Sequence, residues 1–596
     1  MCYWRVKGMI MKHKSDEKST RQSGVSRRAF LTGAGAVGAL TALGAVTGCA
    51  PTLKEGTSKV KEKEETAQDS SASDSSWLGE EPTVNDSECV ETLDYEVVVV
   101  GAGTSGYFAA ASAAENGLKT LLLEKSSSGN SIRSSALGAI NSKLQQEVGD
   151  KGKIDKQAFV NDMDRYAHGH VDSTLIRMWA DNSGEAIDWY TDLMKKNNIE
   201  VQLEWNMPEG TFYTEWPTGH GTNGEYPSRE ADVAKVIDNY IESFDGCAVR
   251  FDTPMKKLIV EDGKVTGLYA EGTNGMVKIN ASKGVVVATG GYAYNEEMFK
   301  ALQPTRYSCL GTLDAFPSCT GDGIKALMWA GAATDDNHQS LTFNRCLLTK
   351  DQNSADPYNT SEYGYHFFAS QPFLRVNNDG NRFHNESAPY DYVFDAISQR
   401  PEGDRVWHQV WDGNWKKDVI RFHTVGCSTL YYRKGADHDA VPGNLDDYVG
   451  PEIESFVEAG YIVKADTLDE LAEKLGFDGE KKENFLATCK QQNKNFDKQD
   501  DPQFGKEAFR LSELRTAPFY ATVKSAGLNL CTLDGVRVNH NFQVLDKEGN
   551  VIEGAYAVGN DQGGFYNGGY PNLAAGLNAG RCATFGRMVG KYLAGK

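Results

Sequence analysis

Three glycines in one short segment have a spacing that predicts a chemical role. Gly101, Gly103 and Gly106 form the pattern GxGxxG. In that pattern the first glycine permits a tight turn, the second lets the backbone approach a pyrophosphate, and the third allows close packing. Glu124 follows 23 residues after Gly101, where its carboxylate can accept hydrogen bonds from a ribose diol. The segment therefore predicts a dinucleotide site made by Gly101, Gly103, Thr104, Ser105, Gly106, Glu124 and Lys125.

The elements that must position these glycines can be read from the same segment. The β-branched run at 95–100 is typical of a strand buried in a parallel sheet, and residues 119–123 predict a second strand. The alanine-rich run between them, to Ala114, predicts a helix whose N-terminus offers free N–H groups to phosphates. This order predicts an α/β fold with a Rossmann-like domain. A purely structural glycine turn is the alternative interpretation.

Segments far from the glycine pattern resemble one flavoprotein superfamily. A strand at 284–287 runs into Ala288-Thr289-Gly290-Gly291, and Gly554–Asp561 resembles a C-terminal strand whose end meets the ribityl chain of a flavin. Gly321-Asp322-Gly323 resembles a flavin-side turn, and residues 380–386 resemble a GxRFxNE segment. Over residues 93–596 the chain resembles the fumarate reductase/succinate dehydrogenase flavoprotein superfamily, in the soluble branch that includes flavocytochrome fumarate reductases, urocanate reductase and 3-ketosteroid Δ1-dehydrogenases.

The resemblance implies FAD as the cofactor and a discontinuous FAD-binding domain. Its two parts are expected at 93–335 and 531–596, with an α+β capping domain at 336–530. The loop at 129–141 holds no histidine, the residue by which membrane-complex members attach FAD, so the implied FAD is non-covalent. Besides the residues above, those implied to contact it are Asn130, Ser131, Ser135, Ala136, Ala139, Ala288, Thr289, Gly290, Asp322, Gly559, Asn560, Asn572, Ala575 and Leu577.

The resemblance also assigns the reaction chemistry to two tyrosines. In fumarate reductases an arginine acts as the acid where this chain has Tyr390, and a second arginine clamps a carboxylate where it has Asn572. Because arginine–carboxylate forks recognise dicarboxylates, fumarate is not the implied substrate, and urocanate is disfavoured for the same reason. Ketosteroid dehydrogenases carry tyrosines at the positions of Tyr390 and Tyr570. The resemblance thus implies Tyr390 as proton donor or acceptor and Tyr570 as carbonyl polariser; the alternative is that both are core aromatics.

The N-terminal residues predict export. Ser26-Arg27-Arg28-Ala29-Phe30-Leu31 is a twin-arginine signature, and the apolar stretch after it is too short for a membrane span. Val46-Thr47-Gly48-Cys49 resembles a lipobox, so residues 1–49 are expected to be a twin-arginine lipoprotein signal; an N-terminal helix of the fold is the alternative. Residues 50–92 predict a flexible linker. The protein is expected to be lipid-anchored on the outer side of the cytoplasmic membrane, at the cell surface or in the periplasm.

The amino-acid composition indicates which classes of binding partner and cofactor to expect. The formal net charge of −20 argues against nucleic acid. None of the 11 cysteines lies in a CxxC or CxxCH motif, and the histidines show no metal-ligand spacing, so neither a c-type haem nor a metal site is expected. Electrons are therefore expected from a separate c-type cytochrome or a quinol-linked donor.

Three functions remain open. The first is a reductase that transfers hydride from flavin N5 to an activated C=C bond of a small apolar or aromatic substrate, of enone or aryl-acrylate type, as in anaerobic respiration. The second is a 3-ketosteroid Δ1-dehydrogenase, which the tyrosine pair favours. The third is a non-catalytic flavin electron shuttle, for which no specific feature argues.

Overall fold

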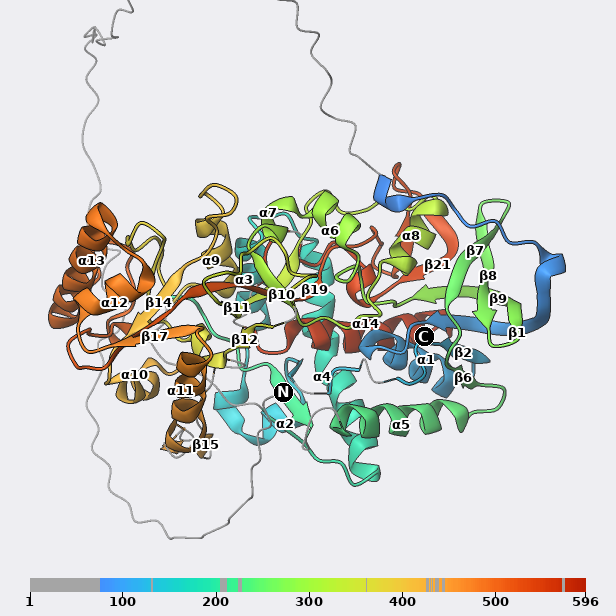
Figure 1. Cartoon of the computed structure of the whole chain (residues 1–596). Helices are drawn as coiled ribbons and strands as arrows, with labels where there is room; N and C mark the ends of the chain where they lie inside the picture. Colours follow the sequence, from blue (N-terminus) through green and yellow to red (C-terminus); the bar gives the residue numbers. More distant parts are fainter. Residues whose placement is uncertain are drawn as a thin grey trace, which may run out of the picture. The chain divides into compact units, whose positions relative to one another are not determined.

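The computed structural model describes residues 76–596 apart from 130–131, 135, 204–211, 223–227, 361, 425–427, 429, 431, 435–438, 442–444, 567 and 571–573 (Figure 1). The predicted signal and residues 50–75 of the predicted linker lie outside this range. The rest of that linker is structured, because η1 (Ser76–Leu78) and η2 (Asp86–Glu88) precede β1 (Cys89–Val100). The linker prediction extended too far. The first half of β1 alternates exposed and half-buried side chains, so it lacks the continuous apolar run that marks a strand buried on both faces.

The central sheet has eight strands and brings distant parts of the chain together. Its order is β20 (Gln543–Leu545), β21 (Val551–Ala557), β9 (Gly275–Val287), β1, β2 (Thr120–Leu123) and β6 (Ala248–Arg250), and β8 (Lys264–Gly272) joins β9 to β7 (Met255–Glu261). β1 pairs in parallel with β2 and β9, and β9 pairs in parallel with β21. The three strands that carry the sequence motifs are therefore neighbours, and the α/β fold class is confirmed.

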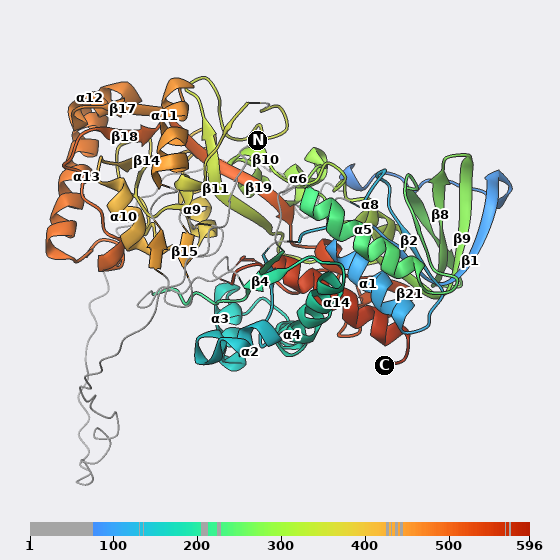
Figure 2. The ribbon, with the colours of Figure 1, turned by 90° about the horizontal axis from the view of Figure 1, so that it is seen from below.

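Each face of the central sheet packs on its own hydrophobic core. Val97 and Val99 face α1 (Thr104–Glu115), α4 (Ser173–Lys196) and α14 (Leu577–Leu593), whereas Val98 and Val100 face the β7–β8 layer and α8 (Asp322–Trp329). α1 lies against α14 and α5 (Ser228–Glu242) (Figure 2). Small residues make the α1–α14 contact, and a Cβ atom on Gly590 would lie 2.8 Å from the Ala109 carbonyl oxygen.

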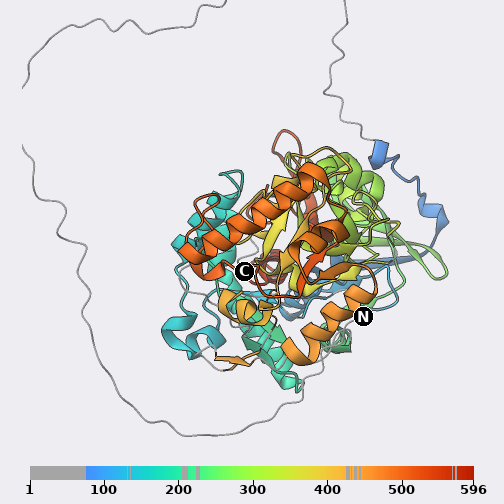
Figure 3. The ribbon, with the colours of Figure 1, turned by 60° about the vertical axis from the view of Figure 1, so that its left-hand side comes forward.

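A second region holds two further sheets (Figure 3). One has the order β10 (Leu310–Leu313), β19 (Lys524–Thr532), β11 (Ser340–Leu348), β12 (Gly364–Tyr365); the other has the order β13 (Leu374–Val376), β14 (His408–Trp411), β18 (Phe519–Thr522), β17 (Ile462–Ala465). Helices around them are α9 (Tyr390–Ile397), α10 (Trp415–Phe422), α11 (Gly450–Glu458), α12 (Leu468–Leu475) and α13 (Gly479–Lys498). β10 lies in the predicted FAD-binding part yet pairs with β19, so the boundary expected at 335/336 cuts through one sheet.

Shorter elements complete the described chain: α2 (Lys143–Glu147), α3 (Lys156–Tyr166), α6 (Glu296–Leu302), α7 (Pro304–Tyr307), β3 (Leu137–Gly138), β4 (Val201–Leu203), β5 (Gly219–Thr222), β15 (Tyr432–Lys434) and β16 (Asp439–Val441). Among the helices of the described residues, none combines the length and apolar character that a membrane span requires.

Candidate active site

The glycine pattern forms the turn from β1 into α1, and its geometry explains why glycine is required. Gly101 has φ +105°, and a Cβ atom there would lie 2.3 Å from the Ala288 carbonyl oxygen. A Cβ atom on Gly106 would lie 1.8 Å from the Gly101 carbonyl oxygen. Gly103 caps α1 without a side-chain hydrogen bond, so the first N–H groups of the helix remain available to a phosphate. This turn fits the pyrophosphate of a dinucleotide.

Glu124, the acid that follows β2, stabilises the same turn through hydrogen bonds. Glu124 is 6% exposed; its Oε2 accepts the Ala102 N–H at 2.8 Å and its Oε1 accepts the Ser126 N–H at 2.8 Å. Each carboxylate oxygen can accept a further hydrogen bond, so the predicted contact with a ribose diol is compatible with this geometry. Lys125 Nζ reaches Asp322 Oδ2 at 2.7 Å, which joins two residues that were predicted from separate motifs.

A buried carboxylate that the sequence did not single out holds the Ala288–Gly291 loop. Asp561, which follows β21, is 0% exposed. It accepts the N–H of Thr289, the Thr289 hydroxyl at 2.9 Å, and the N–H groups of Gly290 at 3.3 Å and Gly291 at 3.0 Å. Burial raises the pKa of Asp561, and these hydrogen bonds partly offset that rise. A single side chain thus ties the Gly554–Asp561 motif to the Ala288–Gly291 motif.

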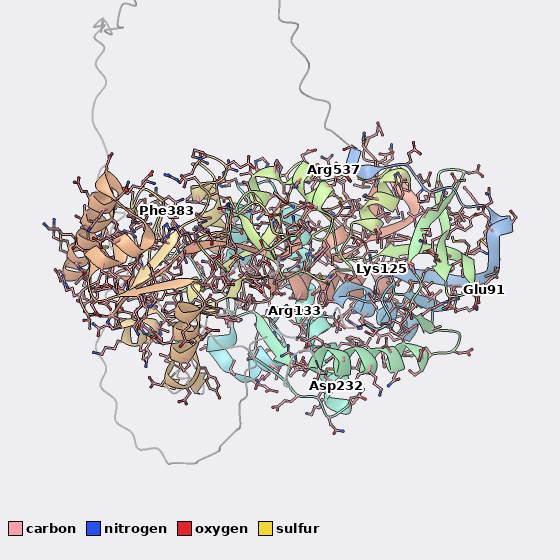
Figure 4. The ribbon with its side chains drawn as sticks, in the orientation of Figure 1. Glu91, Lys125, Arg133, Asp232, Phe383 and Arg537 are labelled. Carbon is pink, nitrogen blue, oxygen red and sulfur yellow. The ribbon has the colours of Figure 1, made fainter. Side chains whose placement is uncertain are left out.

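One cavity connects these segments. It contains about 1520 Å³ of space not filled by atoms, part of it open to solvent. Fourteen of the predicted residues line it: Gly101, Gly103, Thr104, Ser105, Glu124, Lys125, Ala136, Ala288, Thr289, Gly290, Asp322, Asn560, Tyr570 and Ala575. Figure 4 marks Lys125 and Arg133, two charged residues of its wall. The residues present therefore fit an extended dinucleotide cofactor.

The other predicted residues fall into two groups. Gly106, Ala139, Gly559, Leu577 and Tyr390 do not line the cavity. Asn130, Ser131, Ser135 and Asn572 lie outside the described residues, and their roles stay predictions. Wall residues that the sequence analysis did not identify include Arg133, Asp314, Phe316, Leu341, Phe343, Gly576 and Asn578. Arg133 lies in the predicted flavin loop at 129–141 but was not among the residues expected to contact the cofactor. The others lie at or near β10, β11 and the start of α14, which carry no motif that marks them as part of the cavity.

Apolar and aromatic side chains form the wall around Tyr570. Leu341 and Phe343 come from β11 and Leu530 from β19. Tyr570 is 5% exposed, and its ring lies 5.4 Å from that of Tyr566. A flat, largely apolar molecule suits such a wall.

Tyr390 stands behind this wall. Its ring packs edge-on against Phe343, with the ring centroids 5.3 Å apart. The guanidinium of Arg345 lies between Phe343 and Phe367, at 4.3 and 4.4 Å from their centroids, and 5.8 Å from the centroid of Tyr390. Of the two predicted catalytic tyrosines, which are 180 residues apart in the sequence, only Tyr570 lines the cavity, whereas Tyr390 packs against a residue of its wall.

Thiols in the wall are not nucleophiles near neutral pH. Burial raises the pKa of Cys319 and of Cys531 to about 12 each. Cys531 instead accepts a hydrogen bond from Asn578 Nδ2 at 3.5 Å. Within the described part of the chain, no cluster of three His, Cys, Asp or Glu residues could hold a metal ion.

Comparison with known proteins agrees with this geometry. Residues 96–577 match the family described as "FAD binding domain". The chain is 26% identical to the vinyl phenol reductase of Lactiplantibacillus plantarum, covering 84% of this chain and 96% of that protein. It is 27% identical to the NADH:fumarate oxidoreductase of Klebsiella pneumoniae, covering 84% of this chain but only 48% of that protein. Among solved structures, a 3-ketosteroid-Δ4-(5α)-dehydrogenase from Rhodococcus jostii shares the fold, with a TM-score of 0.63 at 20% identity over 86% of this chain and 99% of that one.

Proposed function

This chain belongs to the FAD binding domain family, and from that premise we propose that it is an exported reductase of activated C=C bonds. FAD is its cofactor, and it is an oxidoreductase of the kind that acts on CH–CH groups. The proposed substrate is a small apolar or aromatic molecule of enone or aryl-acrylate type, not a dicarboxylate. Electrons are proposed to come from a separate cytochrome or quinol-linked donor. The N-terminal sequence supports export by the twin-arginine route and a lipid anchor at Cys49.

One observation carries the proposal: the cavity that fits the dinucleotide is also lined by apolar and aromatic side chains, among them Leu341, Phe343 and Tyr570. Bound FAD would supply a hydride at its flavin ring. Tyr570, which lines the cavity with Leu341 and Phe343, is proposed to donate a hydrogen bond to the activating carbonyl of the substrate. Tyr390 packs against Phe343 and does not line the cavity. We propose that substrate binding brings its phenol within reach of the neighbouring carbon, to which it provides the proton. The vinyl phenol reductase relative, matched over nearly its full length, supports an aromatic substrate.

A second candidate is the reverse chemistry, dehydrogenation of a 3-ketosteroid. The tyrosine pair favours it, and a 3-oxosteroid 1-dehydrogenase from Mycolicibacterium smegmatis is 24% identical over 83% of this chain. The two functions differ in direction and in substrate size, so one assay can separate them.

The test is an anaerobic reoxidation screen of the purified, FAD-loaded protein. After reduction with dithionite, we expect rapid reoxidation by aryl acrylates or small enones and slow reoxidation by fumarate and urocanate. Rapid reoxidation by fumarate would contradict the proposed substrate class. Reduction of the oxidised protein by a saturated 3-ketosteroid, without reoxidation by small enones, would favour the dehydrogenase. Reoxidation by none of these compounds would favour an electron shuttle.

Tyr390 is tested by a conservative replacement. Tyr390→Phe should lower kcat by about 10²-fold or more while the protein keeps its FAD, because a positioned general acid contributes a factor of that size. Tyr392→Phe is the matched control, since Tyr392 lies on the same helix and its ring packs against Tyr166 and Tyr213 instead. An unchanged kcat for Tyr390→Phe would dismiss Tyr390 as the acid.

A further inference from the structure

A buried carboxyl group links the two tyrosines of the proposed reaction. Asp391 directly follows Tyr390 in α9 and is 4% exposed. Its Oδ2 accepts the backbone N–H of Tyr570 at 2.7 Å and the side-chain amide of Gln339 at 3.2 Å. One side chain therefore joins the helix that begins with Tyr390, the residue before β11, and the segment that carries Tyr570.

Within its own helix Asp391 has only a modest task. It lies in the first turn of α9, where a carboxylate interacts favourably with the helix dipole, but the N-cap residue is Pro389 and no side-chain hydrogen bond caps the helix. Within the described residues no ion pair reaches Asp391, because the nearby Arg306 pairs with Asp395 at 3.1 Å. A buried acid without an ion pair is costly to keep, whereas an apolar side chain would fill the same space at lower cost. The hydrogen bond to Tyr570 offsets part of that cost.

We infer that Asp391 is a positioning residue that fixes Tyr570 relative to Tyr390. The inference rests on the proposed function, in which one tyrosine binds the carbonyl and the other delivers the proton. These two events occur at different atoms of one conjugated group, so the distance between the phenols must match the substrate. A shift of about 1 Å in such a pair can cost about 10²-fold in rate. Because Asp391 accepts a hydrogen bond from the backbone N–H of Tyr570, it fixes the backbone position from which that side chain extends.

Three variants of the FAD-loaded protein test this role. Asp391→Ala removes the acceptor and should lower kcat by about tenfold or more, with little change in KM and unchanged FAD content. Asp391→Asn keeps an acceptor oxygen and should stay within about threefold of the original kcat. Asp469→Ala is the matched control, because Asp469 is likewise an acid in the first turn of its helix, α12, but its side chain is 67% exposed; it should leave kcat unchanged.

Two outcomes would overturn the inference. One is an unchanged kcat in Asp391→Ala; the other is an equal loss in Asp391→Asn, which would assign the effect to charge rather than to the hydrogen bond. If Asp391→Ala fails to fold, Asp391→Glu replaces it. The extra methylene moves the carboxyl group but keeps its chemistry, so kcat should again fall, and an unchanged kcat would again overturn the inference.

A readout that needs no turnover separates this inference from the proposed function. Hydrogen exchange at the Tyr570 amide should accelerate in Asp391→Ala and stay slow in Asp391→Asn. If the exchange pattern holds but the protein reduces no C=C substrate, the proposed function fails and the link stands as structural only. If Tyr390→Phe and Tyr570→Phe lose turnover while Asp391→Ala keeps it, the proposed function stands and the positioning role fails.

Discussion

A buried ion cluster surrounds Glu386, which lies four residues before Tyr390. It allows a test of how much buried ion pairs contribute to the stability of this fold. Arg382 binds Glu386 through two hydrogen bonds, of 2.8 and 2.7 Å, and binds Asp501 at 2.9 Å. Lys506 Nζ lies 3.3 Å from Glu386 Oε2. All four side chains are at most 3% exposed. The electrostatic balance of this cluster therefore depends on charges that water does not screen.

Glu386→Gln removes one charge and preserves the shape. Arg382 and Lys506 then face Asp501 alone, so a buried cation is left without its share of negative charge. Breaking a buried pair in this way costs about 3 to 5 kcal/mol of unfolding free energy. Burial already lowers the pKa of Lys506 to about 8, and loss of Glu386 would lower it further. Proton release from Lys506 near pH 7 should relieve part of the cost, so we expect a loss of about 3 kcal/mol.

Urea denaturation of the FAD-loaded protein at pH 7 measures this loss. The control is Glu470→Gln, because Glu470 and Lys474 have the same i,i+4 spacing as Arg382 and Glu386 but are 42% and 44% exposed. That exposed pair should contribute much less than the buried one, because solvent screens it. A loss below about 1 kcal/mol for Glu386→Gln, or equal losses in the two variants, would refute the argument from burial.

Two further predictions concern the cofactor turn and the response to pH. Gly106→Ala should lose most bound FAD, as measured by flavin absorbance after purification, because its Cβ atom would meet the Gly101 carbonyl oxygen at 1.8 Å. Gly117→Asn, in open space at φ +88°, should retain FAD, and equal retention by both variants would contradict the steric argument. Burial raises the pKa of Asp335 and of Asp391 to about 7. Their contribution to stability is therefore complete below about pH 4 and is lost as the pH rises through about 7. Asp335→Asn removes the titrating carboxyl group, so its stability relative to the original protein should rise by about 2.6 kcal/mol from pH 5 to pH 8 from the shift alone. Thermal unfolding at both pH values checks this, and a constant difference would show that Asp335 does not titrate there.

Local sequence patterns were sufficient to predict the cofactor-binding turn and the fold class. The segment from Gly101 to Glu124 contains its own helix, second strand and acid, and the contacts of Gly106 with Gly101 and of Glu124 with Ala102 lie within 25 residues, so they leave a readable spacing. Resemblance added the distant motifs that end in Gly291 and Asp561, and the structure places both beside that turn. The start of β1 was missed because one half of that strand faces solvent and carries polar side chains.

Only the tertiary structure decided which buried acids stabilise the site and which apolar side chains line the cavity. Asp561 accepts hydrogen bonds from the Thr289–Gly291 backbone, which lies 270 to 272 residues earlier in the chain. Asp391 accepts one from the backbone N–H of Tyr570, 179 residues later. Leu341 and Phe343 line the cavity because β11 pairs with β19, which is far along the chain. A side chain that accepts a hydrogen bond from a distant backbone N–H cannot be predicted from the sequence, because no periodicity or neighbouring motif marks it. The sequence by itself therefore determined the cofactor and where it begins to bind, whereas folding decided which buried acids and aromatic side chains complete the site.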